Sequence, residues 1–236
     1  MIYAAILAGG TGTRMGAAHP KQFLEFGGRP VIVHTTERFL RHEQIDRVIV
    51  VTPEMWSGYT ERLLAEYFGN SGIILAVGGE TRNETLMNAI AAIEAEGNLN
   101  DDTIIVTHDA VRPFVTEEMI SGNIFIAEEI GACETAFPST DTIVETDDGK
   151  LVKSVPDRSR LWMVQTPQSF RAKKLRELYM SLTEDEKAVL TDAARIYVMK
   201  DEAVGIVKGD SSNIKITYPE DLQIAESIWN KQRKKD

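Results

Sequence analysis

Near its start the chain reads Ile2-Tyr3-Ala4-Ala5-Ile6-Leu7-Ala8-Gly9-Gly10-Thr11-Gly12-Thr13-Arg14-Met15-Gly16, an apolar run followed by a glycine-rich turn. The run over 2–7 has the length and composition of a buried strand. Because glycine lacks a Cβ, backbone N–H groups in the turn can converge on an anion. Arg14 and Lys21 follow, where their positive charges can meet a polyphosphate. The stretch predicts a strand, a phosphate-binding loop and a nucleoside triphosphate site.

Two other kinds of glycine-rich loop fit this stretch less well. A dinucleotide fingerprint needs Gly-x-Gly-x-x-Gly; Gly10 and Gly12 match its first two glycines, but Met15 stands in the third position. A Walker A loop ends in Gly-Lys-Ser/Thr, which the stretch lacks. A plain glycine-rich turn between a strand and a helix is the non-functional alternative, and it gives no reason for Arg14 and Lys21 to accompany the glycines.

Length and composition restrict the class of protein. The chain has 236 residues and fits a single domain, 1–236. Its net charge of −10 argues against nucleic acid as the main partner, and no apolar run approaches the roughly 20 residues of a membrane span. The single cysteine, Cys133, has apolar flanks and is interpreted as a core residue; a lone thiol is typical of a reducing compartment. We expect a cytoplasmic protein that binds neither nucleic acid nor a membrane.

Apolar runs alternate with helical patterns in the first half of the chain. The runs lie at 2–7, 48–51, 73–77 and 104–106, and the helical patterns at 30–40, 54–68, 83–95 and 116–129. Continuous apolar strands are typical of a parallel sheet with helices on both faces. The alternation predicts an α/β fold: a doubly wound, mostly parallel, Rossmann-like sheet that binds ligands at the carboxyl ends of its strands. The segments 9–16, 78–79 and 108–109 each follow a run, so we expect them along that one edge.

The alternation changes after Cys133. Residues 140–146 and 150–155 flank Asp147-Asp148-Gly149, which predicts a β-hairpin with Asp-Gly at its turn. The hairpin has too little apolar content to be a domain of its own. A surface hairpin on a monomer and an arm that reaches a second subunit are both compatible with it.

Four further motifs occur in order along the chain. They are His108-Asp109-Ala110-Val111-Arg112-Pro113-Phe114, Gln165-Thr166-Pro167-Gln168, Leu190-Thr191-Asp192-Ala193 and Asn213-Ile214-Lys215-Ile216-Thr217. Together with the opening loop they resemble the polyol-phosphate cytidylyltransferases over about 2–228. The resemblance implies attack of a polyol phosphate on CTP with Mg²⁺ present. It also implies a homodimer in which protruding β-hairpin arms, about 138–162, help to build the neighbouring site.

The resemblance implies roles for individual residues. The catalytic cations are expected to be Arg14, Lys21 and Lys215. The residues expected to bind CTP are Leu7, Ala8, Gly9, Gly10, Thr11, Gly12, Gly79, Glu80, Arg82, Thr85, Asp109 and Ala110. Asp109 is also expected to hold Mg²⁺, since that ion prefers oxygen ligands. The residues expected at the polyol phosphate are Arg112, Thr142, Arg158 and Thr191, with Thr142 and Arg158 supplied by the partner's arm.

Residue patterns alone leave simpler roles open. Alternation makes Lys215 a solvent-facing lysine of a short β-competent run, and Asp109 and Thr81 are both suited to capping helices. Arg158 alone suggests only a surface ion pair. His108 is interpreted as a hydrogen-bonded structural histidine, because Mg²⁺ has little preference for imidazole nitrogen.

Two polyols remain open within the family: ribitol 5-phosphate and 2-C-methyl-D-erythritol 4-phosphate. Leu7-Ala8-Gly9-Gly10, Val111 and the stretch 141–145 look like the ribitol enzymes, whereas 161–165 is nearer the methylerythritol pattern. We expect ribitol 5-phosphate, giving CDP-ribitol for teichoic acid or another surface polymer. The alternative product serves non-mevalonate isoprenoid synthesis.

Overall fold

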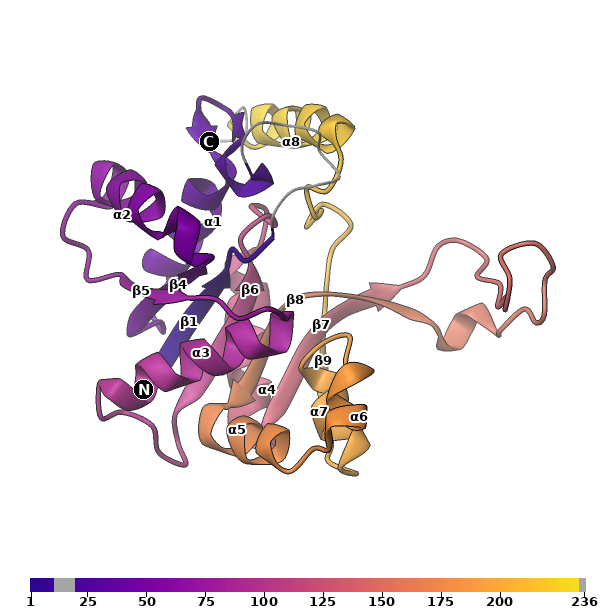
Figure 1. Ribbon diagram of the computed structural model, residues 1–236. Coiled ribbons are helices and arrows are strands. Elements are labelled where there is room, and N and C mark those ends of the chain that lie inside the picture. Colours follow the sequence, from indigo (N-terminus) through magenta and orange to yellow (C-terminus); the bar gives the residue numbers. More distant parts are fainter. Residues whose placement is uncertain (11–19, 234–236) are drawn as a thin grey trace.

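A computed structural model describes residues 1–10 and 20–233, which form a seven-stranded sheet in the order β5-β4-β1-β6-β8-β7-β9 (Figure 1). The strands are β1 (Ile2–Leu7), β4 (Arg47–Thr52), β5 (Ile74–Val77), β6 (Ile104–Asp109), β7 (Ala132–Pro138), β8 (Trp162–Arg171) and β9 (Gly205–Lys208). All of these described strands run parallel except β8, which pairs antiparallel with β6 and β7. The mostly parallel α/β fold expected from the sequence is confirmed.

Helices cover both faces of the sheet. One face carries α1 (Val31–Leu40), α2 (Glu54–Phe68) and α4 (Glu117–Ile130), and the other carries α3 (Arg82–Ala95), α5 (Ala172–Met180) and α7 (Ala194–Met199). The short α6 (Glu184–Ala188) precedes α7, and α8 (Pro219–Gln232) ends the described chain. None of the helices within 1–10 and 20–233 is long and apolar enough to cross a membrane.

The first strand shows why the apolar runs are continuous. Tyr3, Ala5 and Leu7 belong to the core cluster beneath α3, α5 and α7, whereas Ala4 and Ile6 belong to the cluster beneath α1, α2 and α4. A strand buried on both faces has no solvent-facing position, so apolar residues occupy every step. Cys133 lies in the second cluster, as predicted, and burial raises the pKa of its thiol to about 12.

A third, smaller cluster joins α8 to the edge of the sheet. It includes Phe26, Val111, Phe114 and Ile216. Phe26 lies in the two-stranded ribbon formed by β2 (Glu25–Phe26) and β3 (Arg29–Pro30). The cluster holds the chain after β6 and the segment before α8 together, close to the carboxyl end of β1.

The predicted arm protrudes from the sheet between β7 and β8 (Figure 1). Its predicted limits agree with the end of the ladder, where Pro138 pairs with Trp162. The predicted hairpin ladder is wrong: a single antiparallel bridge, Glu145 to Ser154, joins the two sides. An isolated two-stranded ribbon is marginally stable in water. The arm is almost entirely exposed, so it does not pack against an apolar surface of the described residues. The turn was correctly placed, since Gly149 has a φ of 70°.

Candidate active site

A pocket of about 290 Å³ lies at the carboxyl ends of β1 and β6. Its lining comprises Leu7, Ala8, Gly9, Gly10, Lys21, Gln22, Gly79, Glu80, Thr81, Arg82, Thr85, Asp109, Ala110, Val111 and Lys215. The segments that follow β1, β5 and β6 therefore meet at one edge of the sheet, as the apolar runs predicted. Thr11, Gly12 and Arg14 lie outside the described residues.

The end of β1 is tied to the short 3₁₀ helix η2 (Lys21–Phe23) that carries Lys21. The buried Gln22 donates from Nε2 to the carbonyl of Ala8 at 2.8 Å, and Ala8 donates its N–H to Val51 at 2.8 Å. A Cβ added to Gly10 would lie 3.8 Å from Cε of Lys21. The glycine turn and Lys21 thus lie against each other, and η2 directs a positive charge to the start of the pocket.

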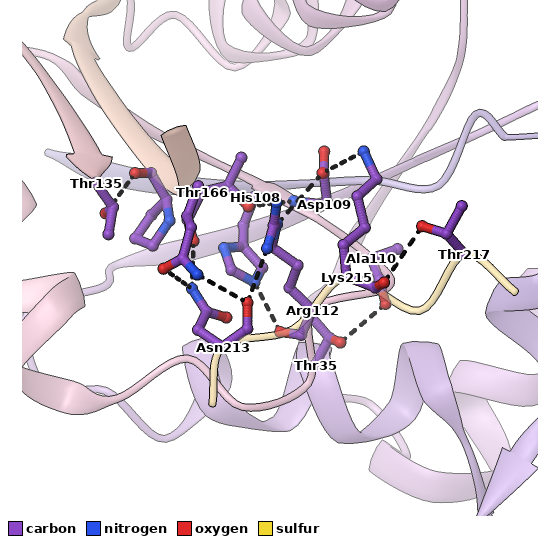
Figure 2. A network of polar contacts seen from close by, with 12 residues as sticks. Thr35, His108, Asp109, Ala110, Arg112, Thr135, Thr166, Asn213, Lys215 and Thr217 are labelled. Atoms are coloured by element: carbon purple, nitrogen blue, oxygen red, sulfur yellow. Dashed lines mark hydrogen bonds and ion pairs between the residues drawn. The ribbon is translucent and has the colours of Figure 1, made fainter. Parts of the chain in front are cut away.

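Asp109 ends β6 and is the centre of a cluster of cations (Figure 2). Its carboxylate lies 2.8 Å from Nζ of Lys215, 3.3 Å from Nη2 of Arg82 and 3.7 Å from Nε of Arg112. Burial alone would raise the pKa of Asp109, but Arg82, Lys215 and Arg112 together lower it well below its usual range. Asp109 is therefore ionised, and the surrounding cations exceed what one carboxylate can neutralise.

Neighbouring backbone holds Asp109 in this position. Ala110 donates its N–H to the carbonyl of Leu7 at 3.1 Å, and Asp109 donates its N–H to Oγ1 of Thr166 at 3.1 Å. Thr166 lies on β8, next to β6 in the sheet. The carboxylate is thus placed by the strand that bears it and by the strands on both sides.

His108 and Arg112 form a second, buried layer behind the carboxylate. The imidazole of His108 lies 2.9 Å from the carbonyl of Arg112, and burial lowers its pKa to about 4. Arg112 donates from Nη1 to the carbonyl of Asn213 at 2.7 Å. His108 is a hydrogen-bonded structural residue, as predicted, and Arg112 connects the turn after β6 to the segment that carries Lys215 (Figure 2).

Lys215 lies in an extended segment outside the named strands. Ile216 is fully buried and donates its N–H to the carbonyl of Val111 at 2.9 Å. Alternation then leaves Lys215 partly exposed on the pocket side, where it meets Asp109. Residue pattern predicted the alternation, whereas the placement of Lys215 in one site with Asp109 was implied only by the family resemblance, since nothing local connects Lys215 to the end of β6.

The loop after β5 begins α3 with a capping box. Oγ1 of Thr81 accepts from the N–H of Glu84 at 3.1 Å, and the carboxylate of Glu84 accepts from the N–H of Thr81 at 3.0 Å. Thr81 is therefore the helix cap that its position suggested. Gly79 is required there, because an added Cβ would collide with the side chain of Glu84. The cap fixes the direction from which Arg82 approaches Asp109.

Thr85 also contacts this loop. Its hydroxyl donates to the carbonyl of Thr81 at 2.8 Å and accepts from the N–H of Gly79 at 3.1 Å. The N–H of Glu80 is bonded to Glu84 at 2.8 Å. The N–H groups of Gly79 and Glu80 therefore both have acceptors within the loop and the first turn of α3.

None of the four expected polyol-binding residues lines the pocket of its own chain, although Arg112 lies 3.7 Å from Asp109, which does. Thr142 and Arg158 lie on the arm, both exposed, and Arg158 donates to the carbonyl of Thr140 at 2.9 Å. Thr191 is exposed before α7, where neighbouring Asp192 accepts from the N–H of Arg195 at 3.0 Å. The expectation that Thr142 and Arg158 act in a partner's site stays a prediction, as does the role of Thr191.

Gln22, Val111 and Asn213 belong to the site or its support but received no expected role. Gln22 follows Lys21 and holds η2, and Asn213 donates from Nδ2 to the carbonyl of Thr166 at 2.9 Å. Asn213 opens the motif at 213–217 and Gln22 adjoins Lys21, but a buried amide with distant partners leaves no local signal. Val111 lines the pocket as an apolar wall residue, which alternation does not distinguish from core.

Asp109 is the candidate metal ligand. Among the residues that the structure describes, no group of three or more His, Cys, Asp or Glu side chains is arranged to hold a metal ion. Mg²⁺ in nucleotide enzymes is commonly held by one or two carboxylates and completed by substrate phosphates and water. The single buried carboxylate fits that arrangement.

Comparisons with known proteins agree on one group. The family described as IspD, 2-C-methyl-D-erythritol 4-phosphate cytidylyltransferase, matches residues 2–231. The ribitol-5-phosphate cytidylyltransferase of Streptococcus pneumoniae serotype 2 (strain D39 / NCTC 7466) is 45% identical over 234 residues, covering 98% of this chain and 100% of the relative. The same values hold for the enzyme of that name from S. pneumoniae serotype 19F (strain G54).

Solved structures share the fold along nearly the whole chain. The 4-diphosphocytidyl-2C-methyl-D-erythritol synthase of Anaerococcus prevotii DSM 20548 is 31% identical with a TM-score of 0.78, covering 98% of this chain and 96% of that one. The 2-C-methyl-D-erythritol 4-phosphate cytidylyltransferase of Thermus thermophilus is 26% identical with a TM-score of 0.73, covering 97% and 98%.

Proposed function

Because the chain belongs to the IspD, or 2-C-methyl-D-erythritol 4-phosphate cytidylyltransferase, family, we propose that it transfers the cytidylyl group of CTP to D-ribitol 5-phosphate. The products are CDP-ribitol and pyrophosphate. The observation that carries the choice of polyol is the 45% identity, over the full length, to ribitol-5-phosphate cytidylyltransferases. The solved structures named for methylerythritol substrates are 26–31% identical.

The charge of the pocket lining and the open turn after β1 support CTP as the nucleotide. Lys21, Arg82 and Lys215 supply positive charge along the lining, and the open glycine turn after β1 admits phosphate oxygens close to the backbone. Carbonyl oxygens of the loop at Gly79 and Glu80 suit the amino group of cytosine, which is a hydrogen-bond donor. The pocket thus offers cations to the triphosphate and acceptors to the base.

The reaction joins two anions, so its barrier is largely electrostatic. A phosphate oxygen of the polyol phosphate attacks the α-phosphorus of CTP, and the bond from that phosphorus to the bridging oxygen breaks as pyrophosphate leaves. Negative charge grows on the oxygens of the α-phosphate during attack. Lys21 and Lys215 neutralise that charge from two sides, and Arg112 is proposed to add positive charge for the entering phosphate from behind Asp109. Arg14 is proposed to hold the outer phosphates, on the sequence alone.

Asp109 is proposed to hold Mg²⁺ together with oxygens of the triphosphate. When bound, the ion supplies positive charge to the phosphates and draws them into one geometry. The protein's part is to keep Asp109 ionised and oriented, which the three nearby cations and the N–H bond to Thr166 accomplish.

A homodimer is the proposed assembly. The arm exposes Ile143, Val144, Leu151, Val152 and Val155, and exposed apolar side chains gathered on one segment are typical of an interaction surface. A partner's arm would bring Thr142 and Arg158 to the polyol side of the pocket. The proposed location is the cytoplasm, where CTP is available. The product, CDP-ribitol, would supply ribitol for teichoic acid or another surface polymer.

Pyrophosphate release with CTP and Mg²⁺ tests the proposed function. Ribitol 5-phosphate and 2-C-methyl-D-erythritol 4-phosphate are compared as acceptors in separate reactions. The proposal expects a kcat/KM at least about tenfold higher for ribitol 5-phosphate, a difference of about 1.4 kcal/mol in transition-state binding. Preference for the methylerythritol substrate would replace the proposed polyol, and no release with either would reject the activity.

A further inference from the structure

A row of polar side chains crosses the sheet two residues before Asp109, which lines the active-site pocket. Thr107 on β6 pairs with Gln168 on β8, and Gln168 pairs with Glu134 on β7. Directly paired residues point to the same face of a sheet, and so do residues two apart in one strand. The row therefore continues the face that carries Asp109, and leads from that carboxylate toward β7.

The neighbouring row on the same face shows how unusual this polarity is. Two residues back along the strands, Ile105, Phe170 and Ala132 pair in the same way, and all three are apolar and fully buried. Polar groups in a buried row cost free energy unless they have partners. Within this row the hydroxyl of Thr107 is satisfied, because it donates to the carbonyl of Gln168 at 3.1 Å. The polar groups that still need a partner therefore lie at the Gln168 and Glu134 end.

The far end of the polar row combines the carboxylate of Glu134 with the amide of Gln168. Gln168 is only 1% exposed, and its Nε2 lies 3.4 Å from Oε2 of Glu134. Its Oε1 is buried and has no hydrogen-bond partner within residues 1–10 and 20–233. Burial, together with the nearby carboxylate of Asp192, raises the pKa of Glu134. Asp192 stands at the start of α7, which packs against β7.

The two ends of this face carry opposite charge. Lys215 and Arg112 surround Asp109 at one end, whereas Glu134 and Asp192 lie at the other. A phosphate is attracted to the first end and repelled from the second, so the charges orient a molecule that has a phosphate at one end only. Two strand spacings and two residues separate the Cα atoms of Asp109 and Glu134, roughly 12 Å.

We propose that Glu134, Gln168 and Asp192 bind the hydroxyl groups of the polyol at the end away from its phosphate. The inference rests on the proposed function. Hydroxyl groups donate to carboxylates and to the amide oxygen, and accept from the amide nitrogen, so each member of the group has a use. Ribitol 5-phosphate is one carbon longer than a four-carbon polyol phosphate and carries one more hydroxyl group. Glu134, Gln168 and Asp192 would therefore favour the longer polyol.

Replacement of Glu134 tests the inference. The variants are Glu134→Leu, the milder Glu134→Gln, and Asp192→Asn. The change Asp192→Asn retains an oxygen that can accept from the N–H of Arg195. The matched control is Glu129→Leu, on an exposed part of α4. Each variant is assayed for kcat/KM with ribitol 5-phosphate and with D-erythritol 4-phosphate, for KM of CTP, and for its melting temperature.

We expect Glu134→Leu to lower kcat/KM for ribitol 5-phosphate by about 10- to 100-fold, mainly through KM, as is typical of a lost hydrogen bond to a charged group. Erythritol 4-phosphate, CTP and the control are expected to change by less than about threefold. If the ratio of kcat/KM for the two polyols is unchanged in both Glu134→Leu and Glu134→Gln, with both rates lowered or neither, that result overturns this inference and leaves the proposed function standing. Absence of ribitol 5-phosphate turnover in the unmodified protein rejects the proposed function and the inference with it.

Discussion

The edge of the sheet and the arm are built in opposite ways. At the edge, Asp109 is held by its own strand, by Thr166 on the next strand and by three cations. On the arm, one bridge joins Glu145 to Ser154, and apolar side chains face outward. The edge is thus fixed by contacts within one chain, whereas the described residues give the arm few contacts of its own.

The largest expected effect comes from removing a cation at the edge. Lys21→Ala and Lys215→Ala are each expected to lower kcat by about 10²- to 10³-fold, because each removes charge stabilisation that grows in the transition state. Lys208→Ala, at an exposed position on β9, is the control. Turnover is measured by pyrophosphate release and folding by circular dichroism. Normal turnover in either variant would remove that lysine from the mechanism.

A smaller effect is expected in the pH dependence of stability. Burial lowers the pKa of His108 from 6.5 to about 4, so the unfolded chain binds a proton at a higher pH than the folded chain does. The stabilisation is complete above about pH 6.5 and is lost as the pH falls toward about 4, amounting to about 3 kcal/mol. His34 is also buried and its pKa is lowered, so it adds to the same trend.

Urea unfolding between pH 7 and pH 4 measures that dependence. The free energy of unfolding of the unmodified protein is expected to fall more steeply with pH than that of His108→Gln. The comparison isolates His108, since His34 is present in both proteins. Equal slopes would show that His108 takes up its proton as easily in the folded chain as in the unfolded one, contrary to its position behind Asp109.

The smallest expected effect on stability belongs to the arm. Leu151 is 75% exposed, so Leu151→Asp is expected to change the free energy of unfolding of the sheet by less than about 0.5 kcal/mol. The same variant is expected to shift sedimentation from dimer to monomer. A variant that remains dimeric would show that the exposed apolar residues of the arm do not hold the partner.

Mixing inactive proteins tests whether the arm serves a second chain. Lys21→Ala is expected to disable the edge and Arg158→Ala the arm, so a mixed dimer would retain one intact edge beside one intact arm. With random exchange, about a quarter of the sites are intact. Recovery of activity on mixing supports exchange between chains, and its absence in a mixture shown to contain mixed dimers contradicts it.

Most of the fold follows from local pattern. The strand Ile2–Leu7 and the helix Glu54–Phe68 have the limits that the sequence predicts, because a strand buried on both faces and a long helical pattern leave unbroken signals. The prediction of two paired strands in the arm was wrong for a related reason. Asp148-Gly149 specifies a turn, but a ladder also needs a surface against which its apolar face can pack, and that surface is not local.

The site, too, has parts that local pattern predicts and parts that it does not. The convergence of Gly9, Gly79 and Asp109 follows from strand topology, since each comes after a parallel strand. The position of Lys215 beside Asp109 came from family resemblance, because contacts such as that between Arg112 and Asn213 join residues 101 apart in the chain. The polar row through Gln168 depends on a register that shifts between Glu134 and Thr135, which periodicity does not encode.

Direct competition between the two polyols tests whether this pocket transfers a cytidylyl group to ribitol 5-phosphate. Equal concentrations of ribitol 5-phosphate and 2-C-methyl-D-erythritol 4-phosphate are incubated with CTP, Mg²⁺ and the protein, and the products are identified by ³¹P NMR and mass spectrometry. We expect CDP-ribitol in at least about tenfold excess. Diphosphocytidyl-methylerythritol as the main product would contradict it.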